Sequence, residues 1–403
     1  MSYHDETSRT LAYARHETLE GLLQRGRGLG AKRAAYDPEA AAPFIYDGIH
    51  RDWKWDSSDD RCLYQARLIR DLKLSPAPAI EQLAGDEEEC SRAAGVLERL
   101  ALDGSEEARE GLRAYIRDGK HWVYVLQSVA VAWPAEWWED LADVARARIG
   151  ELEDLPWSRE PWSRFGIETP GSRFSPRPSL GGLSDDELLA LLAASGTEFN
   201  TKIDALRVLA GREPAEALIP LVPSLGNGPH RPLPFLSPVV ERLGALAVPA
   251  ARGWAVDGRE WLARLGADVL ANHPGPEALP GLVSELTEQW TARAWCGPDT
   301  TAKRLANFGP EAADAVPVLW RYWRHTPHSY ERTDYLMALA RIDPSGLDDA
   351  YAECLWDCEK RARLLGIASA PHHPQTLHRI AVLRDDPMET PEVRAAAGAR
   401  LAP

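Results

Sequence analysis

Cysteine and histidine side chains near the C-terminal end are the first residues whose types and spacing could do chemistry. Cys354 and Cys358 are four positions apart, which predicts that they share one helix face, and His372 and His373 follow them. A structural zinc ion takes four nitrogen or sulfur ligands, and the sequence has no closely spaced C-x2-C pair. Two reduced thiols in a helical core are the simpler interpretation, and we expect no metal and no cofactor.

A second group of polar side chains occurs in "RHTPHSYERTDY", where His325 and His328 lie with Tyr330 and Asp334 at an expected turn. Histidine is suited to proton transfer near neutral pH. The sequence has no nucleophile elbow, no H-E-x-x-H pair and no phosphate-binding loop that would make use of it. We therefore assign no catalytic residue and keep His325 and His328 as candidates for contact with a ligand or partner.

Tryptophans outside the helical pattern form a third group. Trp53 and Trp55 in "HRDWKWDSSDD" are two positions apart and cannot share a helix face. With Asp56 they could stack on a flat or cationic ligand, or they could pin a loop onto the first helices. Trp157 and Trp162, in the short duplication "PWSREPWSRF", predict either a plug between two helical blocks or an exposed recognition loop. All five residues are retained as binding candidates.

The elements that must position these residues recur along the C-terminal half. Leu270, Leu305 and Leu339 end equivalent small helices that are 34–35 residues apart. After each turn a second helix begins, and proline occurs near its start, as Pro317 does in "FGPEAADAVPVLWRYWRHT". The first four N–H groups of a helix have no acceptor inside it, so a proline there loses no hydrogen bond.

The repeated turn followed by "EA..AVP.L", at 213–221, 276–282 and 310–319, resembles the HEAT repeat, a helical repeat here of the bacterial type. The resemblance is good from about residue 200 to 402 and weaker from 59 to 149. It implies an all-α fold, an α-α superhelix of stacked antiparallel helix pairs, and implies little about activity. In such a stack Trp320 and Trp323 lie on the apolar stripe of their helix and are expected in the core.

The chain divides by composition into three segments. Residues 1–149 are expected to form an N-terminal helical block with degenerate repeats, in which "RGRGLGAKR" is a loop. Residues 150–183 are a connector rich in proline, serine and tryptophan. Residues 184–403 are expected to form the C-terminal repeat array, and the sequence has no convincing run of strands.

Length, charge and cysteine usage narrow the classes of function. A chain of 403 residues exceeds the size of a single core. Its net charge of −15 disfavours nucleic acid and anionic membranes and would suit a basic partner. No apolar stretch is long enough for a membrane span, and the N-terminus has no apolar core of a signal peptide. The five scattered cysteines predict reduced thiols and a cytoplasmic protein.

These observations favour a non-catalytic scaffold that binds a protein or peptide partner, as an adaptor or an immunity-type antagonist. Two alternatives stay open. The first is a HEAT-like enzyme, since the alkylpurine DNA glycosylases have a similar fold and use Trp and Asp on a concave surface. The second is a small-molecule binder with an aromatic-lined pocket, which the 15 tryptophans permit.

Overall fold

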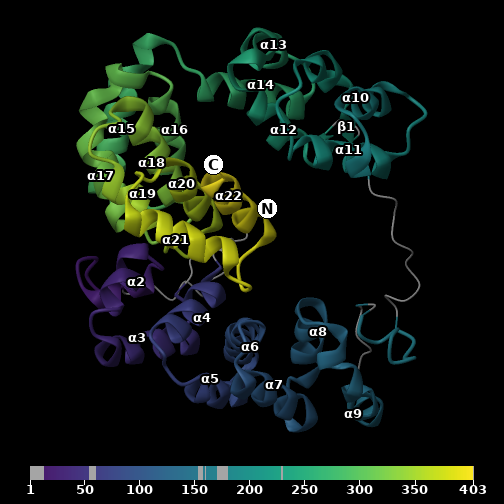
Figure 1. The fold of residues 1–403 in the computed structure, drawn as a ribbon. Coiled ribbons are helices and arrows are strands. Elements are labelled where there is room, and N and C mark those ends of the chain that lie inside the picture. Colours follow the sequence, from purple (N-terminus) through teal and green to yellow (C-terminus); the bar gives the residue numbers. More distant parts are fainter. Residues whose placement is uncertain are drawn as a thin grey trace. The chain divides into compact units, whose positions relative to one another are not determined.

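The computed structural model describes residues 13–53, 60–152, 158, 160–169, 180–227 and 230–402. Within these ranges the protein is built of helices (Figure 1). The strands described are a two-residue antiparallel pair, β1 (Gly226–Asn227) and β2 (Arg231–Pro232), with Gly226 opposite Pro232. The prediction of an all-α fold of packed helices is confirmed. Across the same ranges, every helix is too short or too polar to cross a bilayer.

The described residues form two compact units. Unit 1 comprises residues 1–175, 317–340 and 344–403, and unit 2 comprises 176–316 and 341–343. The α-helices of the N-terminal part of unit 1 are α1 (Leu19–Gln24), α2 (Gly28–Ala34), α3 (Pro38–His50), α4 (Arg61–Asp71), α5 (Ala77–Glu81), α6 (Glu87–Leu102), α7 (Glu106–Asp118), α8 (Trp122–Ala132) and α9 (Ala142–Arg148). Its short 3₁₀ helices are η1 (Gln82–Ala84), η2 (Ala135–Trp137), η3 (Glu139–Leu141) and η4 (Ile149–Glu151).

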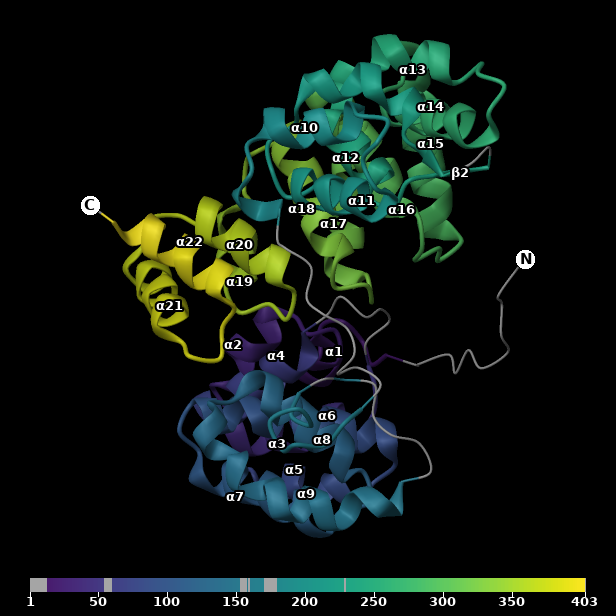
Figure 2. The same ribbon diagram turned by 90° about the vertical axis from the view of Figure 1, so that its right-hand side faces the viewer.

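The C-terminal part of unit 1 contributes the last helices of the chain. They are α17 (Val316–His325), α18 (Glu331–Ile342), α19 (Asp348–Cys354), α20 (Lys360–Ser369), α21 (Pro374–Asp385) and α22 (Pro391–Leu401). The N-terminal helices α2 and α4 lie beside α19 and α21 in both views (Figures 1 and 2). Helices from opposite ends of the chain therefore share one unit, whereas the expected boundaries placed residues 184–403 in one continuous array.

Unit 2 is formed by the middle of the chain. Its α-helices are α10 (Asp185–Ala193), α11 (Phe199–Leu209), α12 (Leu236–Leu243), α13 (Val248–Trp254), α14 (Glu260–Asn272), α15 (Leu279–Thr291) and α16 (Pro298–Ala306). The 3₁₀ helices are η6 (Leu180–Gly182), η7 (Glu216–Ser224), η8 (Gly244–Ala247), η9 (Pro276–Ala278) and η10 (Gly309–Ala315). Leucine and valine from α10 to α14 form its apolar core.

Proline marks the start of the second helix in several pairs. Helices α13, α15 and α17 each follow directly on a 3₁₀ helix and carry proline at their second position, Pro249, Pro280 and Pro317. A first-turn N–H has no intrahelical acceptor, so this placement costs no hydrogen bond, while the preceding 3₁₀ turn fixes the direction of entry. The recurring prolines at these three positions are thus helix starts, whereas Pro220 and Pro223 lie inside the 3₁₀ helix η7.

The core of unit 1 joins distant segments. The apolar cluster that runs from α1 to α9 also contains Cys358 and Met388 from the C-terminal part. Two glycines allow this approach: a Cβ on Gly26, whose φ is +63°, would lie 2.3 Å from the Cys358 sulfur, and one on Gly28 would lie 2.0 Å from the Glu353 carbonyl oxygen. The stretch "RGRGLGAKR", expected to be a loop, instead ends α1 and forms most of α2, so its glycines serve close packing.

Arginine side chains that pack over tryptophan rings explain part of the tryptophan excess. The guanidinium carbon of Arg27 lies 4.2 Å from the centre of the Trp323 ring, and that of Arg148 lies 5.0 Å from the centre of Trp122. Indole is the aromatic ring that binds cations best, so an arginine packed over a ring favours tryptophan over phenylalanine. Trp323 is buried, as expected, and Trp320 is half-buried with its ring edge-on to Trp323.

Candidate functional site

Four buried arginines and four acidic residues join the two parts of unit 1. We call this set the arginine seam; its members are Arg27, Arg67, Arg332, Arg363, Glu353, Asp357, Asp386 and Glu389. Arg27 bonds to both carboxylate oxygens of Glu353, at 2.6 and 2.9 Å. Arg67 bonds to Asp386 at 2.8 Å and to Glu389 at 2.7 Å. Arg27 and Arg67 thus pair with carboxylates far away in the sequence, and the seam crosses from the start of α2 and from α4 to the C-terminal helices.

The C-terminal members of the seam are paired among themselves as well. Arg363 bonds to both oxygens of Glu389, at 2.8 and 3.0 Å, and both side chains have 0% exposure. Arg332 bonds to both oxygens of Asp357, at 3.1 and 2.7 Å, and donates to the Arg25 carbonyl oxygen. Bidentate pairs of this kind satisfy most of the donors that burial removes from water.

Two of the seam carboxylates, Asp357 and Asp386, occupy turns for a local reason. Asp357 accepts the backbone N–H of Glu359 at 2.9 Å, and Asp386 accepts that of Met388 at 3.0 Å. Short acidic side chains favour such turns because they bond to the backbone two residues on. Each turn that starts a new helix therefore also presents a carboxylate to an arginine.

Nearby arginines lower the pKa of three of the seam carboxylates, Glu353, Asp386 and Glu389. Burial by itself would raise the pKa of Glu353, but the Arg27 guanidinium outweighs it and holds the pKa below its usual value. Burial would also raise the pKa of Asp386 and of Glu389. The charge of Arg67 acts in the opposite direction, and the pKa of each is lowered. The seam is a paired ionic network, which ties the unit together and leaves no activated proton donor or acceptor among these three carboxylates.

Two cysteines, Cys354 and Cys358, lie near the seam. Helix α19 ends at Cys354, and Cys358 lies in the turn that follows, so the two residues do not share a helix face as the spacing predicted. Both are buried and not disulfide-bonded. Burial raises the pKa of Cys354 well above its ordinary value, and burial also raises the pKa of Cys90. A protonated, buried thiol is a poor nucleophile and a poor metal ligand.

The tryptophan candidates are placed in the core where the structure describes them. Trp53 is 6% exposed, and its indole nitrogen donates to the Asp47 carboxylate at 3.1 Å. Trp162 has 0% exposure and meets the rings of Trp122 and Phe165 edge-on. Neither ring is a surface for a partner in this arrangement. Trp55, Asp56 and Trp157 lie outside the described residues.

The histidine candidates lie in different surroundings. His328 is buried, with its ring 5.5 Å from that of Tyr330. His325 is half-buried at the end of α17, and its ring lies against that of His16 at an interplanar angle of 36°, with 3.5 Å between ring centres. The Arg25 guanidinium donates to the His325 carbonyl oxygen at 3.3 Å and lies over the Tyr13 ring, whose hydroxyl donates to the Trp53 carbonyl oxygen. Of the predicted residues, the structure therefore brings Trp53 and His325 to one cluster around Arg25.

The lowered pKa of His16 predicts a pH effect on stability. Burial lowers the pKa of His16, and the nearby guanidinium of Arg25 acts in the same direction, against the opposing charge of Glu17. Below about pH 6.5 the unfolded chain binds a proton that folded His16 resists, so stability falls as the pH falls through this window. We expect His16→Gln to reduce the slope of the urea midpoint between pH 7.5 and 5.5. An unchanged slope would contradict this assignment.

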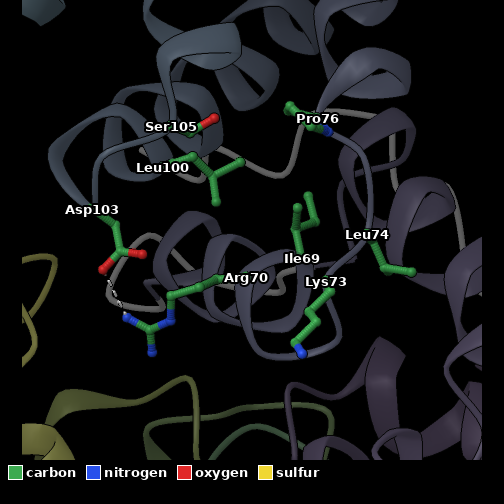
Figure 3. A pocket seen from close by; sticks show the side chains of 8 residues that line it. All are labelled: Ile69, Arg70, Lys73, Leu74, Pro76, Leu100, Asp103 and Ser105. Carbon is green, nitrogen blue, oxygen red and sulfur yellow. Dashed lines mark hydrogen bonds and ion pairs between the residues drawn. The ribbon is translucent and has the colours of Figure 1, made fainter.

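A pocket of about 190 Å³ lies in unit 1 between the end of α4 and the turn before α7 (Figure 3). Ile69, Leu74 and Leu100 supply much of its apolar lining. The Arg70 guanidinium donates to Asp103 at 3.2 Å on one side, and Lys73 lies on the other. The residues that line it are Ile69, Arg70, Lys73, Leu74, Pro76, Leu100, Asp103 and Ser105.

The pocket combines an apolar interior with a charged rim. Burial raises the pKa of Asp103, and Arg70 opposes the effect. Among the described residues, no carboxylate lies within ion-pair distance of Lys73, so its ammonium group is the available charge at the rim. Sequence reasoning missed these residues, because "RLIRDLKLSPAP" has the pattern of an ordinary amphipathic helix end.

A metal site is the next feature to consider. In the described part of the chain, no three His, Cys, Asp or Glu side chains are grouped as metal ligands would be. No family model, no curated protein and no solved structure matches the chain.

Proposed function

We propose that the protein is a non-catalytic HEAT-like scaffold that binds a protein or peptide partner. The observation that carries the proposal is the 190 Å³ pocket at the end of α4. Sites for small molecules usually measure about 300–1,000 Å³ and are lined by aromatic rings. This pocket is smaller and has no aromatic lining, and its size suits a single anchoring side chain of a larger partner.

Charge supports a partner of basic character. The chain carries a net charge of −15, and opposite net charges steer two proteins together and raise the association rate. The burial of Trp53 weighs against the glycosylase alternative, because an indole that lies in the core cannot stack on a nucleobase. Duplex binding would also require a basic surface.

Partner capture tests the proposal. We expect the tagged full chain to recover one stoichiometric partner from its native cell extract, with recovery that falls as salt rises. Leu74→Asp places a charge on the apolar wall and is expected to reduce recovery at least about tenfold, the effect of about 1.4 kcal/mol. Leu246→Asp, at a 50% exposed leucine of unit 2, is the matched control and is expected to behave as wild type.

Two results would overturn the proposal. One is equal recovery by wild type and Leu74→Asp, with both proteins folded by circular dichroism. The other is release of bases from alkylated DNA by the purified chain without a recovered partner, which would favour the enzyme.

A further inference from the structure

Arg379 in α21 differs from every arginine of the seam in how few of its donors are used. It is 5% exposed, and its Nε donates to the Leu355 carbonyl oxygen at 3.2 Å. Its nearest carboxylate oxygen, on Asp71, is 3.9 Å from a terminal nitrogen, which is too far for a hydrogen bond. Among the described residues, the terminal nitrogens of Arg379 donate no hydrogen bond.

The terminal N–H groups of Arg379 have no acceptor among the described residues, and they are not fully closed off from water. Arginine carries five N–H donors and stays protonated in proteins. Burial lowers the pKa of Arg379 to about 9, and the neighbouring Arg67 guanidinium adds to the effect. Arg363, by comparison, bonds to two carbonyl oxygens and both oxygens of Glu389. Arg379 therefore has the carboxylates of Asp71 and Asp386 nearby but donates a hydrogen bond to neither.

The nearby carboxylates are already engaged by other arginines. Asp71 accepts from Arg70 at 2.8 Å. Asp386 accepts from Arg67 at 2.8 Å and from Arg70 at 3.0 Å. Neither carboxylate can turn fully to Arg379 without leaving its present partner. The terminal N–H groups of Arg379 are therefore open to an acceptor from the solvent, either water or a bound anion.

A second cation faces the same aromatic ring. The Arg379 guanidinium carbon lies 5.0 Å from the centre of the Trp356 ring, and the Lys32 ammonium nitrogen lies 5.2 Å from that centre. Lys32 is exposed on α2, and no described carboxylate lies within ion-pair distance of it. Trp356 is half-buried in the turn after α19. Two cations thus converge on one indole where α2, the α19–α20 turn and α21 meet (Figures 1 and 2).

We propose that Arg379 and Lys32, held at the ring of Trp356, form a binding site for an oxyanion, either a carboxylate or a phosphate group. A guanidinium presents paired N–H groups that match both, and an ammonium adds a flexible point charge. The exposed Lys32 admits the anion, and the donors of Arg379 fix it. This site is separate from the pocket at the end of α4 and does not depend on the scaffold proposal.

Thermal unfolding of the full chain with added anions tests the site. We expect inorganic phosphate, acetate or both to raise the Tm saturably, relative to sodium chloride at the same ionic strength, because a ligand that binds only the folded state stabilises it. The anion that raises the Tm at the lower concentration shows whether the site prefers a phosphate or a carboxylate group. Arg379→Gln is expected to abolish the saturable rise. Lys32→Gln is expected to weaken the apparent Kd by about tenfold, the loss of one charge-assisted bond.

Lys120→Gln is the matched control, since Lys120 is also an exposed lysine without a described ion pair. It is expected to respond as wild type does. If Arg379→Gln fails to fold, Lys32→Gln against Lys120→Gln decides the question. The proposal is overturned if neither anion shifts the Tm beyond the chloride effect, or if Lys32→Gln responds as the control does.

Discussion

Replacing Arg363 with methionine is expected to lower the free energy of unfolding by about 3–5 kcal/mol, the usual cost of removing one partner from a buried ion pair. Arg363 and Glu389 both have 0% exposure, and Arg363 also donates to the carbonyl oxygens of Asp357 and Cys358. The variant leaves a buried carboxylate with only Arg67 as its ionic partner. Because Arg67 remains, we expect the loss to lie near 3 kcal/mol. Urea unfolding followed by circular dichroism measures it.

An exposed ion pair on the same helix provides the control for Arg363. Lys360 bonds to Glu392 at 2.6 Å, and their side chains are 43% and 59% exposed. Solvent-exposed pairs contribute about 0–1 kcal/mol, so Lys360→Met should change stability very little. Equal effects of the two substitutions would show that the seam does not stabilise the unit as described.

Truncation of Trp162 to alanine is expected to cost about 3–5 kcal/mol, as for other fully buried large side chains. The ring has 0% exposure, lies 5.9 Å from the Trp122 ring centre, and its indole nitrogen donates to Ser158 at 3.2 Å. The change would leave a cavity that its aromatic neighbours cannot fill. Thermal or urea unfolding of the full chain measures the loss directly.

Half-buried Trp137, with Arg109 over its ring at 5.3 Å, is the comparison for Trp162. Trp137→Ala is expected to cost about 1 kcal/mol, because less apolar area leaves the water and no closed cavity forms. If Trp162→Ala unfolded as wild type does but lost partner binding, Trp162 would be a recognition residue and its burial would need another explanation.

The sequence predicted the helices well because the features that start and stop a helix lie close together in the chain. Apolar spacing, acidic helix starts and first-turn prolines such as Pro280 and Pro317 act within one or two turns of chain. The division of the chain into two units could not be predicted from such local patterns. It depends on pairs such as Arg27 with Glu353 and Arg67 with Asp386, which no periodicity within a helix can match.

Site residues were harder to predict than helices for a related reason. Trp53 stands among charged residues and has the sequence context of an exposed loop, but the Asp47 carboxylate and the Tyr13 hydroxyl satisfy its polar atoms in the core. Arg379 has the sequence context of an ordinary helix residue. Its unusual character arises because Arg67 and Arg70 lie nearby and have already bonded to the local carboxylates. Only the packing of separate helices shows that competition.

The order in which the ribosome makes the chain has a consequence for the arginine seam. Arg27 and Arg67 emerge early, and their carboxylates at Glu353, Asp386 and Glu389 are synthesised only after the whole of unit 2. Until then the nascent N-terminal helices carry guanidinium groups that must remain hydrated. Synthesis of these carboxylates, and not the length of the first helical block, therefore sets the moment at which the seam can form, and a product that stops before Asp386 cannot pair Arg67.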